Sequence, residues 1–454
     1  MVHPLVEYFR CPEPLAALGT AGPLPERPGY FKFGEAIAFG RQAAGEASPQ
    51  PDGRLVDVLA GVSSVDGTIC LPFDLSEAVS NLRHERYPEA QYAVEHVSDS
   101  SLQHSVYYFF RPILPVRVRK HLQRLHWRGW TDIPFPQWPV DVSVERMMRS
   151  AVRLLLERGG AREFPFIWFW PDGAPGCVMM THDVEGAAGA RFCGRLMDLD
   201  EQFGIRSSFQ VVPEAPWSSE ASTRQLVGDL KRRGFEVNVH DVNHDGRLFR
   251  DRERFLRHAA TINTRGREFG TRGFRSGAMY RRQDWFAALD ISYDMSVPNV
   301  AHLEPQRGGC CTVMPFFIDH VLELPLTAAQ DYTVFQVLGD YSTRLWQEQI
   351  DRILEHSGLI SFIAHPDYLI EPRARDVYAD LLRLLVGLRS DRGVWIAQPS
   401  EIDEWWRNRR EMSLVPDGGS WRVRGPDSSR ARVAWARLDG GHVVYDVGQP
   451  RRAA

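Results

Sequence analysis

Two groups of side chains in this sequence have the types and spacing that a divalent-cation site needs. The first group is Asp183 and Glu185, and the second is His240 and His244. Carboxylate oxygens and imidazole nitrogens are the protein ligands of zinc and similar metal ions. Two imidazoles and one carboxylate leave coordination positions open for water and for a substrate carbonyl, which is the arrangement of a hydrolytic site.

Each group follows a short apolar, β-prone run, so we expect both groups at the carboxyl ends of strands. Between them the sequence predicts a helix over 188–203, a strand over 207–213 and a second helix over 219–233. This alternation is typical of repeated β/α units, in which the loops after the strands carry the functional side chains.

The same alternation continues after the histidine pair. Helices are expected over 248–264, 281–289, 342–356 and 372–389, and strands over 273–276, 291–295, 321–326, 359–364 and 394–397. About seven β/α units predict an α/β fold with a distorted (β/α)7-type barrel.

The composition is that of a globular protein, with 43% hydrophobic and 25% charged residues in a chain of 454. A net charge of −4 argues against a chain-wide nucleic-acid footprint, so we expect no nucleic-acid partner. Six cysteines without C-x-x-C spacing favour free thiols. The first residues lack the pattern of a signal peptide and no apolar run reaches membrane-spanning length, so we expect a cytoplasmic protein.

The length exceeds one ordinary domain, and the sequence predicts three parts. They are a partly irregular N-terminal extension over 1–160, the barrel over 161–412 and a small antiparallel β appendage over 413–454. Every formal charge over 111–128 is positive, which favours a solvated helix face and leaves open a peripheral contact with an anionic membrane. We expect the aromatic run 164–171 to be buried packing rather than a sugar-stacking platform.

The order of these motifs resembles that of the polysaccharide deacetylases, the carbohydrate esterases of family 4 with a NodB-homology domain. The family's first motif is Thr-Phe-Asp-Asp-Gly, and here Thr181 to Glu185 reads Thr-His-Asp-Val-Glu. The family's His-Ser/Thr-x-x-His is matched by His240 to His244, and its Leu-x-His at a late strand end by Ile363 to His365. Its Arg-x-Pro-Tyr has a counterpart in Arg275 to Tyr280, which reads Arg-Ser-Gly-Ala-Met-Tyr. The resemblance covers about 170–405 and implies a barrel with fewer than eight strands.

The resemblance also implies roles in catalysis. It makes Asp183 the general base, Arg275 the group that pairs with and orients this base, and His365 the acid that protonates the leaving amine. The backbone at Met279 and Tyr280 is a candidate N–H donor to the oxyanion, and so a candidate substrate contact.

The expected metal ligands are Glu185, His240 and His244. We expect zinc, with cobalt, nickel or manganese as alternatives. Side chains alternate along a strand, so Asp183 and Glu185 project to one face while Val184 packs on the other. The longer side chain of Glu185 would let its carboxylate reach back to the cation.

The sequence departs from the family pattern at several places. Val184 stands at the position of the second Asp, which binds metal in the family, and His182 replaces the usual Phe. The Pro of the third motif is missing, and no clear fourth motif is present, which leaves Asp294 and Asp331 as candidate partners of His365.

Three functions are compatible with this pattern. We favour a hydrolase that uses metal-activated water to remove an acetyl or other acyl group from an N-acylated sugar or glycan precursor. One alternative is an amidohydrolase of the same fold that acts on a small cyclic amide, as allantoinase-like relatives do. The other is a non-catalytic glycan-binding protein with a decayed site.

Overall fold

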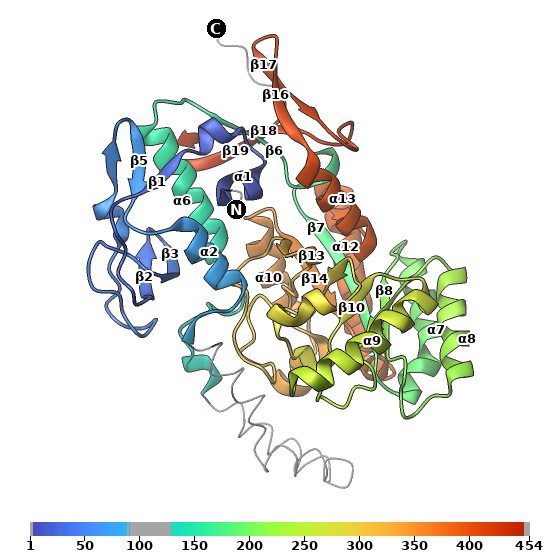
Figure 1. Ribbon diagram of the computed structural model, residues 1–454. Coiled ribbons are helices and arrows are strands. Elements are labelled where there is room, and N and C mark those ends of the chain that lie inside the picture. Colours follow the sequence, from blue (N-terminus) through green and yellow to red (C-terminus); the bar gives the residue numbers. More distant parts are fainter. Residues whose placement is uncertain (1–2, 89, 91–128, 449–454) are drawn as a thin grey trace. The chain divides into compact units, whose positions relative to one another are not determined.

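The structure is a computed structural model that describes residues 3–88, 90 and 129–448 (Figure 1). The basic segment 111–128, with the membrane contact considered for it, lies outside the described residues. In the described part of the chain, no helix is both long and apolar enough to cross a membrane.

The chain divides into two compact units. The barrel unit comprises 88–140 and 177–403, and the discontinuous unit comprises 1–87, 141–176 and 404–454. The discontinuous unit therefore draws on all three sequence ranges, the extension, the expected barrel range and the C-terminal appendage.

The barrel unit is built on a nine-stranded sheet with the order β12-β13-β11-β10-β9-β8-β7-β14, and β15 also pairs with β7. The strands are β7 (Cys177–Val184), β8 (Ser208–Val211), β9 (Glu236–His240), β10 (Gly273–Arg275), β11 (Tyr293–Asp294), β12 (Phe316–Ile318), β13 (Val321–Glu323), β14 (Leu359–Ile363) and β15 (Trp395–Ile396). All neighbours are parallel except β12 and β13. Strand β7 is buried at every position, as expected of a parallel strand that is covered on both faces.

Helices connect the parallel strands. They are α7 (Ala187–Gln202), α8 (Glu220–Arg232), α9 (Arg252–Phe269), α10 (Arg344–Leu354), the short α11 (Pro366–Leu369) and α12 (Pro372–Arg392), and α13 (Pro399–Glu411) follows β15. The helix predicted over 281–289 was wrong in type, because Gln283–Ala288 is a 3-10 helix. The amide of Leu289 bonds the carbonyl of Phe286, three residues back, which is the tighter 3-10 pattern.

The segment after β13 brings the two edges of the sheet together. The Ala328 amide donates to Ser361 O at 3.1 Å. The Thr327 hydroxyl donates to Leu359 O at 2.7 Å and accepts from the Ser361 amide at 2.9 Å, so a side chain replaces one link of the backbone ladder. These bonds join residues 327–328 to β14, and the predicted distorted barrel is confirmed. Its sheet has nine strands in the described part of the chain, so the expectation of fewer than eight was wrong.

Within the described residues, the discontinuous unit contains small sheets, most of α13 and three further α-helices. Its helices are α1 (Pro4–Phe9), α2 (Leu75–Arg83) and α6 (Ser143–Arg158), and its strands are β1 (Leu18–Thr20), β2 (Gly29–Phe33), β3 (Ala36–Gly40), β4 (Ser63–Val65), β5 (Thr68–Leu71), β6 (Phe164–Ile167), β16 (Ser413–Asp417), β17 (Ser420–Arg424), β18 (Val433–Asp439) and β19 (His442–Val447). Strand β6 pairs antiparallel with β18, more than 260 residues later in the sequence.

The aromatic run 164–171 belongs to this unit and is buried. The Phe166 ring packs edge-on against Phe9 and Tyr445, with ring centroids 5.1 and 5.3 Å away. Trp168, Phe169 and Trp170 are also buried. The expectation of buried packing is therefore confirmed.

Gly273 in β10 provides a test of the packing inside the barrel sheet. A Cβ at this position would lie 2.3 Å from Asn238 Oδ1 and 2.3 Å from the Tyr293 ring. We predict that Gly273→Ala lowers the free energy of unfolding by about 1–3 kcal/mol, because both neighbours must move. Gly194→Ala in α7, where a Cβ would meet nothing within 4 Å, is the control and should raise it by up to about 1 kcal/mol. Chemical denaturation measures both, and equal effects would contradict this account.

Candidate metal and catalytic site

The strand register of the barrel sheet places the site residues predicted from the sequence at the carboxyl ends of neighbouring strands. His240 ends β9 and is the register partner of Arg275, which ends β10. Asp183 is the second-to-last residue of β7, and His365 follows β14, whose Ile363 is the register partner of Thr181. The carboxyl ends of these strands therefore bring together groups that are far apart in the sequence.

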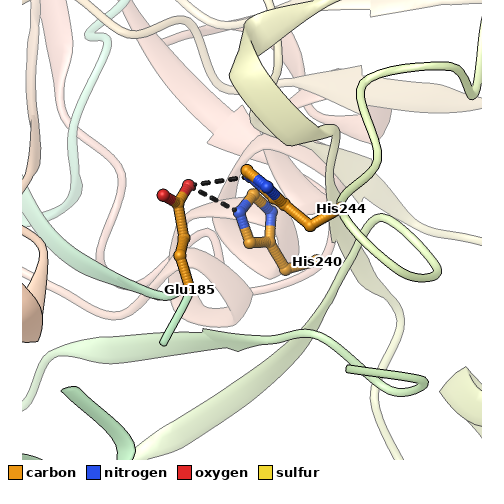
Figure 2. Close-up of side chains that lie close together, drawn as sticks. All are labelled: Glu185, His240 and His244. Atoms are coloured by element: carbon orange, nitrogen blue, oxygen red, sulfur yellow. Dashed lines mark hydrogen bonds and ion pairs between the residues drawn. The ribbon is translucent and has the colours of Figure 1, made fainter. Parts of the chain in front are cut away.

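Glu185, His240 and His244 converge in the way the sequence predicted (Figure 2). Glu185 Oε1 lies 3.3 Å from His240 Nε2 and 2.9 Å from His244 Nε2. Figure 2 shows both imidazole rings directed toward the Glu185 carboxylate. Glu185 is the most exposed of the three groups, with 27% of its side chain accessible.

The donor set fits a divalent cation. Ligand atoms of a tetrahedral zinc site lie about 3.4 Å apart when metal–ligand distances are near 2.1 Å, close to the separations seen here. His240 Nδ1 lies 3.1 Å from Arg275 O, which can only accept, so Nδ1 carries the proton and Nε2 faces the site with its lone pair. His244 Nε2 is buried beside Glu185 Oε1 and receives no hydrogen bond, so its lone pair becomes available to a cation once the ring loses its proton.

The charges of this group depend on one another. Burial opposes protonation of His244, but the Glu185 carboxylate outweighs burial and raises the pKa of His244 to about 9. Burial likewise opposes ionisation of Glu185, but His244, His365 and His240 lower its pKa well below the usual range. A bound cation would replace the proton on His244 as a counter-charge of Glu185.

Asp183 forms a buried ion pair with Arg275. Arg275 Nη1 donates to Asp183 Oδ1 at 2.7 Å and to Thr181 Oγ1 at 2.7 Å, and Nε donates to Met295 O at 3.0 Å. Burial alone would raise the pKa of Asp183, but the positive charges of Arg275 and of the nearby histidines outweigh it and lower that pKa. Asp183 Oδ2 lies 3.9 Å from His240 Nε2, at the border of the ligand group.

His365 is held by Asp331, one of its two candidate partners. His365 Nδ1 lies 2.6 Å from Asp331 Oδ1, and the His365 amide donates to Asp331 Oδ2 at 2.7 Å. Nε2 points to the site, 3.6 Å from Glu185 Oε1. Burial opposes protonation, but Asp331 and Glu185 raise the pKa of His365 well above its usual value. Asp294, the other candidate, instead accepts hydrogen bonds from Ser296.

Two residues of the first motif face away from the site. His182 is fully buried, and its ring nitrogens lie 2.9 Å from Ala364 O and 3.1 Å from Asp200 Oδ2 of α7. Val184 is also fully buried. The alternation expected along β7 therefore holds, with Asp183 and Glu185 on the face of the site.

The proposed oxyanion donors lie in a tight turn after β10. The Tyr280 amide donates to Gly277 O at 3.3 Å, so the turn itself already uses this group. The Met279 side chain packs in a buried cluster with Leu326 and Ile363. The structure thus places the turn beside the strand that precedes His365, while a donor role for the Met279 and Tyr280 backbone stays a prediction.

The sequence predicted Asp367 only as a turn residue after His365, and the contact of its side chain with α7 was missed. Its Oδ1 accepts the Gly189 amide at 2.9 Å near the start of α7, while its Oδ2 is buried without a partner. Burial raises the pKa of Asp367, and the negative charge of Glu185 adds to this effect. The signal in the sequence was the acidic residue two positions after His365, in the first turn of α11.

Comparison with known proteins gives structural similarity at low sequence identity. No protein-family model matches the chain, and no curated protein matches it. Similar solved structures include proteins assigned as polysaccharide deacetylases from Mycobacterium smegmatis (TM-score 0.44, 17% identity, 53% of this chain and 93% of that one) and Pseudomonas aeruginosa PAO1 (0.43, 13%, 52% and 93%). A CE4 family pseudoenzyme from Bacillus anthracis is also similar (0.33, 13%, 50% and 65%). Likeness at these scores carries no functional conclusion.

The metal site makes its own prediction. His240→Ala or His244→Ala should abolish stoichiometric metal binding, and Glu185→Gln should weaken it at least about 10-fold, because each removes one of three ligands. Asp183→Asn should retain the metal. Metal analysis after reconstitution with zinc, and competition with a chelator, measure these effects. Unchanged affinity in Glu185→Gln would refute its role and move Asp183 into the ligand set.

The His365–Asp331 pair predicts a pH effect in the metal-free protein. Asp331→Asn should lower the pKa of His365, because the variant removes the charge that most favours the imidazolium. Protonated His365 stabilises the fold fully below its unfolded pKa of about 6.5, and this contribution is lost as the pH rises through the folded value. The variant should therefore lose more stability at acidic than at alkaline pH.

NMR titration of the histidine ring protons and denaturation at several pH values measure the two effects. Asp294→Asn is the matched control, because Asp294 was the other candidate partner and makes no hydrogen bond to His365. A His365 pKa that stays the same in Asp331→Asn would contradict the assignment.

Proposed function

We propose that this protein is a metal-dependent hydrolase that removes an acyl group from the nitrogen of an N-acylated sugar or glycan precursor. One observation carries the proposal: a ligand group of two histidines and a carboxylate lies between a buried carboxylate–arginine pair and a histidine–aspartate pair. Amide hydrolysis needs one group to take a proton from water and another to give a proton to the leaving amine. The site has one candidate for each.

The metal group would be held by Glu185, His240 and His244. When bound, a divalent cation supplies Lewis acidity that polarises the amide carbonyl and makes a water more acidic. Zinc is the proposed ion, because imidazole nitrogen and carboxylate oxygen are its common ligands, and cobalt, nickel or manganese could bind the same set.

Asp183 is the proposed general base. Arg275 lowers its pKa and therefore keeps it ionised, ready to accept a proton. The hydrogen bond from Arg275 occupies Oδ1, so Oδ2 is the oxygen left for the water. Arg275 also fixes the direction of the carboxylate, because its guanidinium is itself held by Thr181 and by Met295 O.

His365 is the proposed general acid. Asp331 binds Nδ1 and raises the pKa of the ring, so Nε2 carries a proton that points toward the site. The imidazolium can give this proton to the amine as the C–N bond breaks. The sugar part of the proposal rests on the resemblance of the motifs to those of the carbohydrate esterases.

Turnover tests the acid role. His365→Ala should lower kcat by about 100-fold or more on N-acetylated chitooligosaccharides, with bound zinc retained, because an amine leaves poorly without a proton. Acetate release measures turnover, and metal analysis measures retention. His442→Ala, which removes an exposed histidine of β19, is the control and should be neutral. Near-normal turnover in His365→Ala would exclude the acid role.

Product analysis distinguishes the competing functions. Acetate from N-acetylated sugars, with no ring opening of a cyclic ureide such as allantoin, supports the deacetylase. Ureide hydrolysis alone would replace it with the cyclic-amide amidohydrolase. Glycan binding without bound metal or turnover would indicate a decayed site.

A further inference from the structure

Two acidic side chains face each other in the barrel sheet behind Arg275. Asp294 of β11 and Glu323 of β13 are register partners in neighbouring parallel strands. Both are fully buried, and their carboxyl groups lie within hydrogen-bond reach of each other. Among the described residues, neither forms an ion pair with an arginine or lysine within 4.0 Å. Two adjacent ionised carboxylates in this environment would repel each other, and only the more distant charges of Arg275 and Arg281 would offset this repulsion.

The hydrogen bonds around the pair differ between its members. Asp294 accepts the Ser296 amide at Oδ2 and the Ser296 hydroxyl at Oδ1, each at 2.8 Å. Glu323 Oε1 accepts the Val297 amide at 3.0 Å, but Oε2 is buried and receives no donor. A protonated Oε2 would donate to Asp294, so one proton satisfies the unpaired oxygen and removes one of the two charges.

We propose that Asp294 and Glu323 share one proton at neutral pH, with Glu323 as the acid and Asp294 as the carboxylate, and that this pair positions Arg275. Arg275 therefore pairs directly with Asp183, while Asp294 acts on it through the neighbouring Met295 and Ser296. The role of the pair in catalysis rests on the proposed function, whereas the shared proton is independent of that function.

Several contacts connect Asp294 to Arg275. The Ser296 hydroxyl that donates to Asp294 also accepts the amide of Ser276, the residue after Arg275, at 2.9 Å. Arg275 Nε donates to Met295 O, one residue after Asp294. Any shift of Asp294 would therefore be transmitted to Arg275 through both backbone and side chain.

The electrostatics agree with this geometry. Burial is the main cause that raises the pKa of both acids. At Glu323 the charge of Asp294 adds to the effect of burial, and the pKa of Glu323 is raised well above its usual value. At Asp294 the charge of Arg275 and the hydrogen bonds from Ser296 oppose the effect of burial. The proton is therefore expected on Glu323.

Infrared spectroscopy of the full-length, metal-free protein tests the shared proton directly. At neutral pH the native protein should show the carbonyl stretch of a protonated carboxylic acid, shifted by exchange into D2O. Glu323→Gln should remove this band, because the variant has no carboxylic acid at this position. Its amide can still donate a hydrogen bond to Asp294, so the local structure should be retained. An unchanged band in Glu323→Gln overturns the proposal.

Two controls assign the band. Glu236→Gln changes another glutamate of the sheet, whose carboxylate accepts from Tyr293 and Asn238, and should leave the band in place. Glu304→Gln removes any carboxylic acid band from a further buried glutamate, whose pKa burial raises, so the band that remains is the one assigned to Glu323. Carbon-13 labelling of all glutamate carboxyls needs no variant: it should shift the band, and an unshifted band would assign the proton to aspartate and overturn the proposal.

Stability gives a second measurement. A raised folded pKa means that Glu323 favours the fold most below its unfolded value, and that this contribution is lost as the pH rises. The denaturant midpoint of the native protein should therefore fall relative to that of Glu323→Gln between pH 5 and 8. Parallel pH dependence of the two midpoints would contradict the assignment of the proton to Glu323.

The positioning of Arg275 has its own readout. The nitrogen-15 NMR signal of Arg275 Nε–H, identified by its loss in Arg275→Lys, should move in Asp294→Asn and stay nearly unchanged in Glu323→Gln. A signal that is unaffected by Asp294→Asn would overturn the positioning role. None of these measurements needs a substrate, so their outcome is separate from success or failure of the deacetylase proposal.

Discussion

The buried guanidinium of Arg275 is the constraint on which the arrangement of the site depends. Its side chain holds Asp183 and Thr181 of β7, and its carbonyl accepts from His240 Nδ1 and from the Asp241 amide. One residue therefore orients both the candidate base and one candidate metal ligand. A charge with no exposed surface is expensive to bury unless it is paired, and loss of one partner of such a pair typically costs about 3–5 kcal/mol. The neighbouring strands must therefore keep their register for the site to exist.

Glu185 links the metal group to the acid–base groups. Its Oε1 lies within 3.6 Å of His240, His244 and His365. In the absence of a cation, protons on His244 and His365 supply the positive charge that the carboxylate needs. Metal binding and proton binding are therefore competing ways to neutralise the same centre, and the affinity for metal should fall as the pH falls.

The sequence alone was sufficient for the features that depend on local periodicity. The β/α alternation predicted the parallel sheet, and the alternation along β7 placed Asp183 and Glu185 on one face. It also indicated the ligand set, because each member ends or follows a strand. Longer-range pairings had a weaker signal or none. The sequence left Asp331 and Asp294 as candidate partners of His365, and only the fold selects Asp331, while Asp294 and Glu323 meet because β11 and β13 are neighbours in the sheet. The 3-10 helix Gln283–Ala288 was missed because its apolar spacing resembles that of an α-helix.

The pairing of β6 with β18 has a consequence for how the chain is made. During synthesis the ribosome releases β6 well before β18, and the whole sheet of the barrel unit emerges between them. The barrel unit has all its strands once residue 396 has left the ribosome, whereas β6 can pair with β18 only after residue 439 has also emerged. Co-translational folding should therefore complete the barrel sheet first, and the discontinuous unit should become resistant to proteases after the barrel unit.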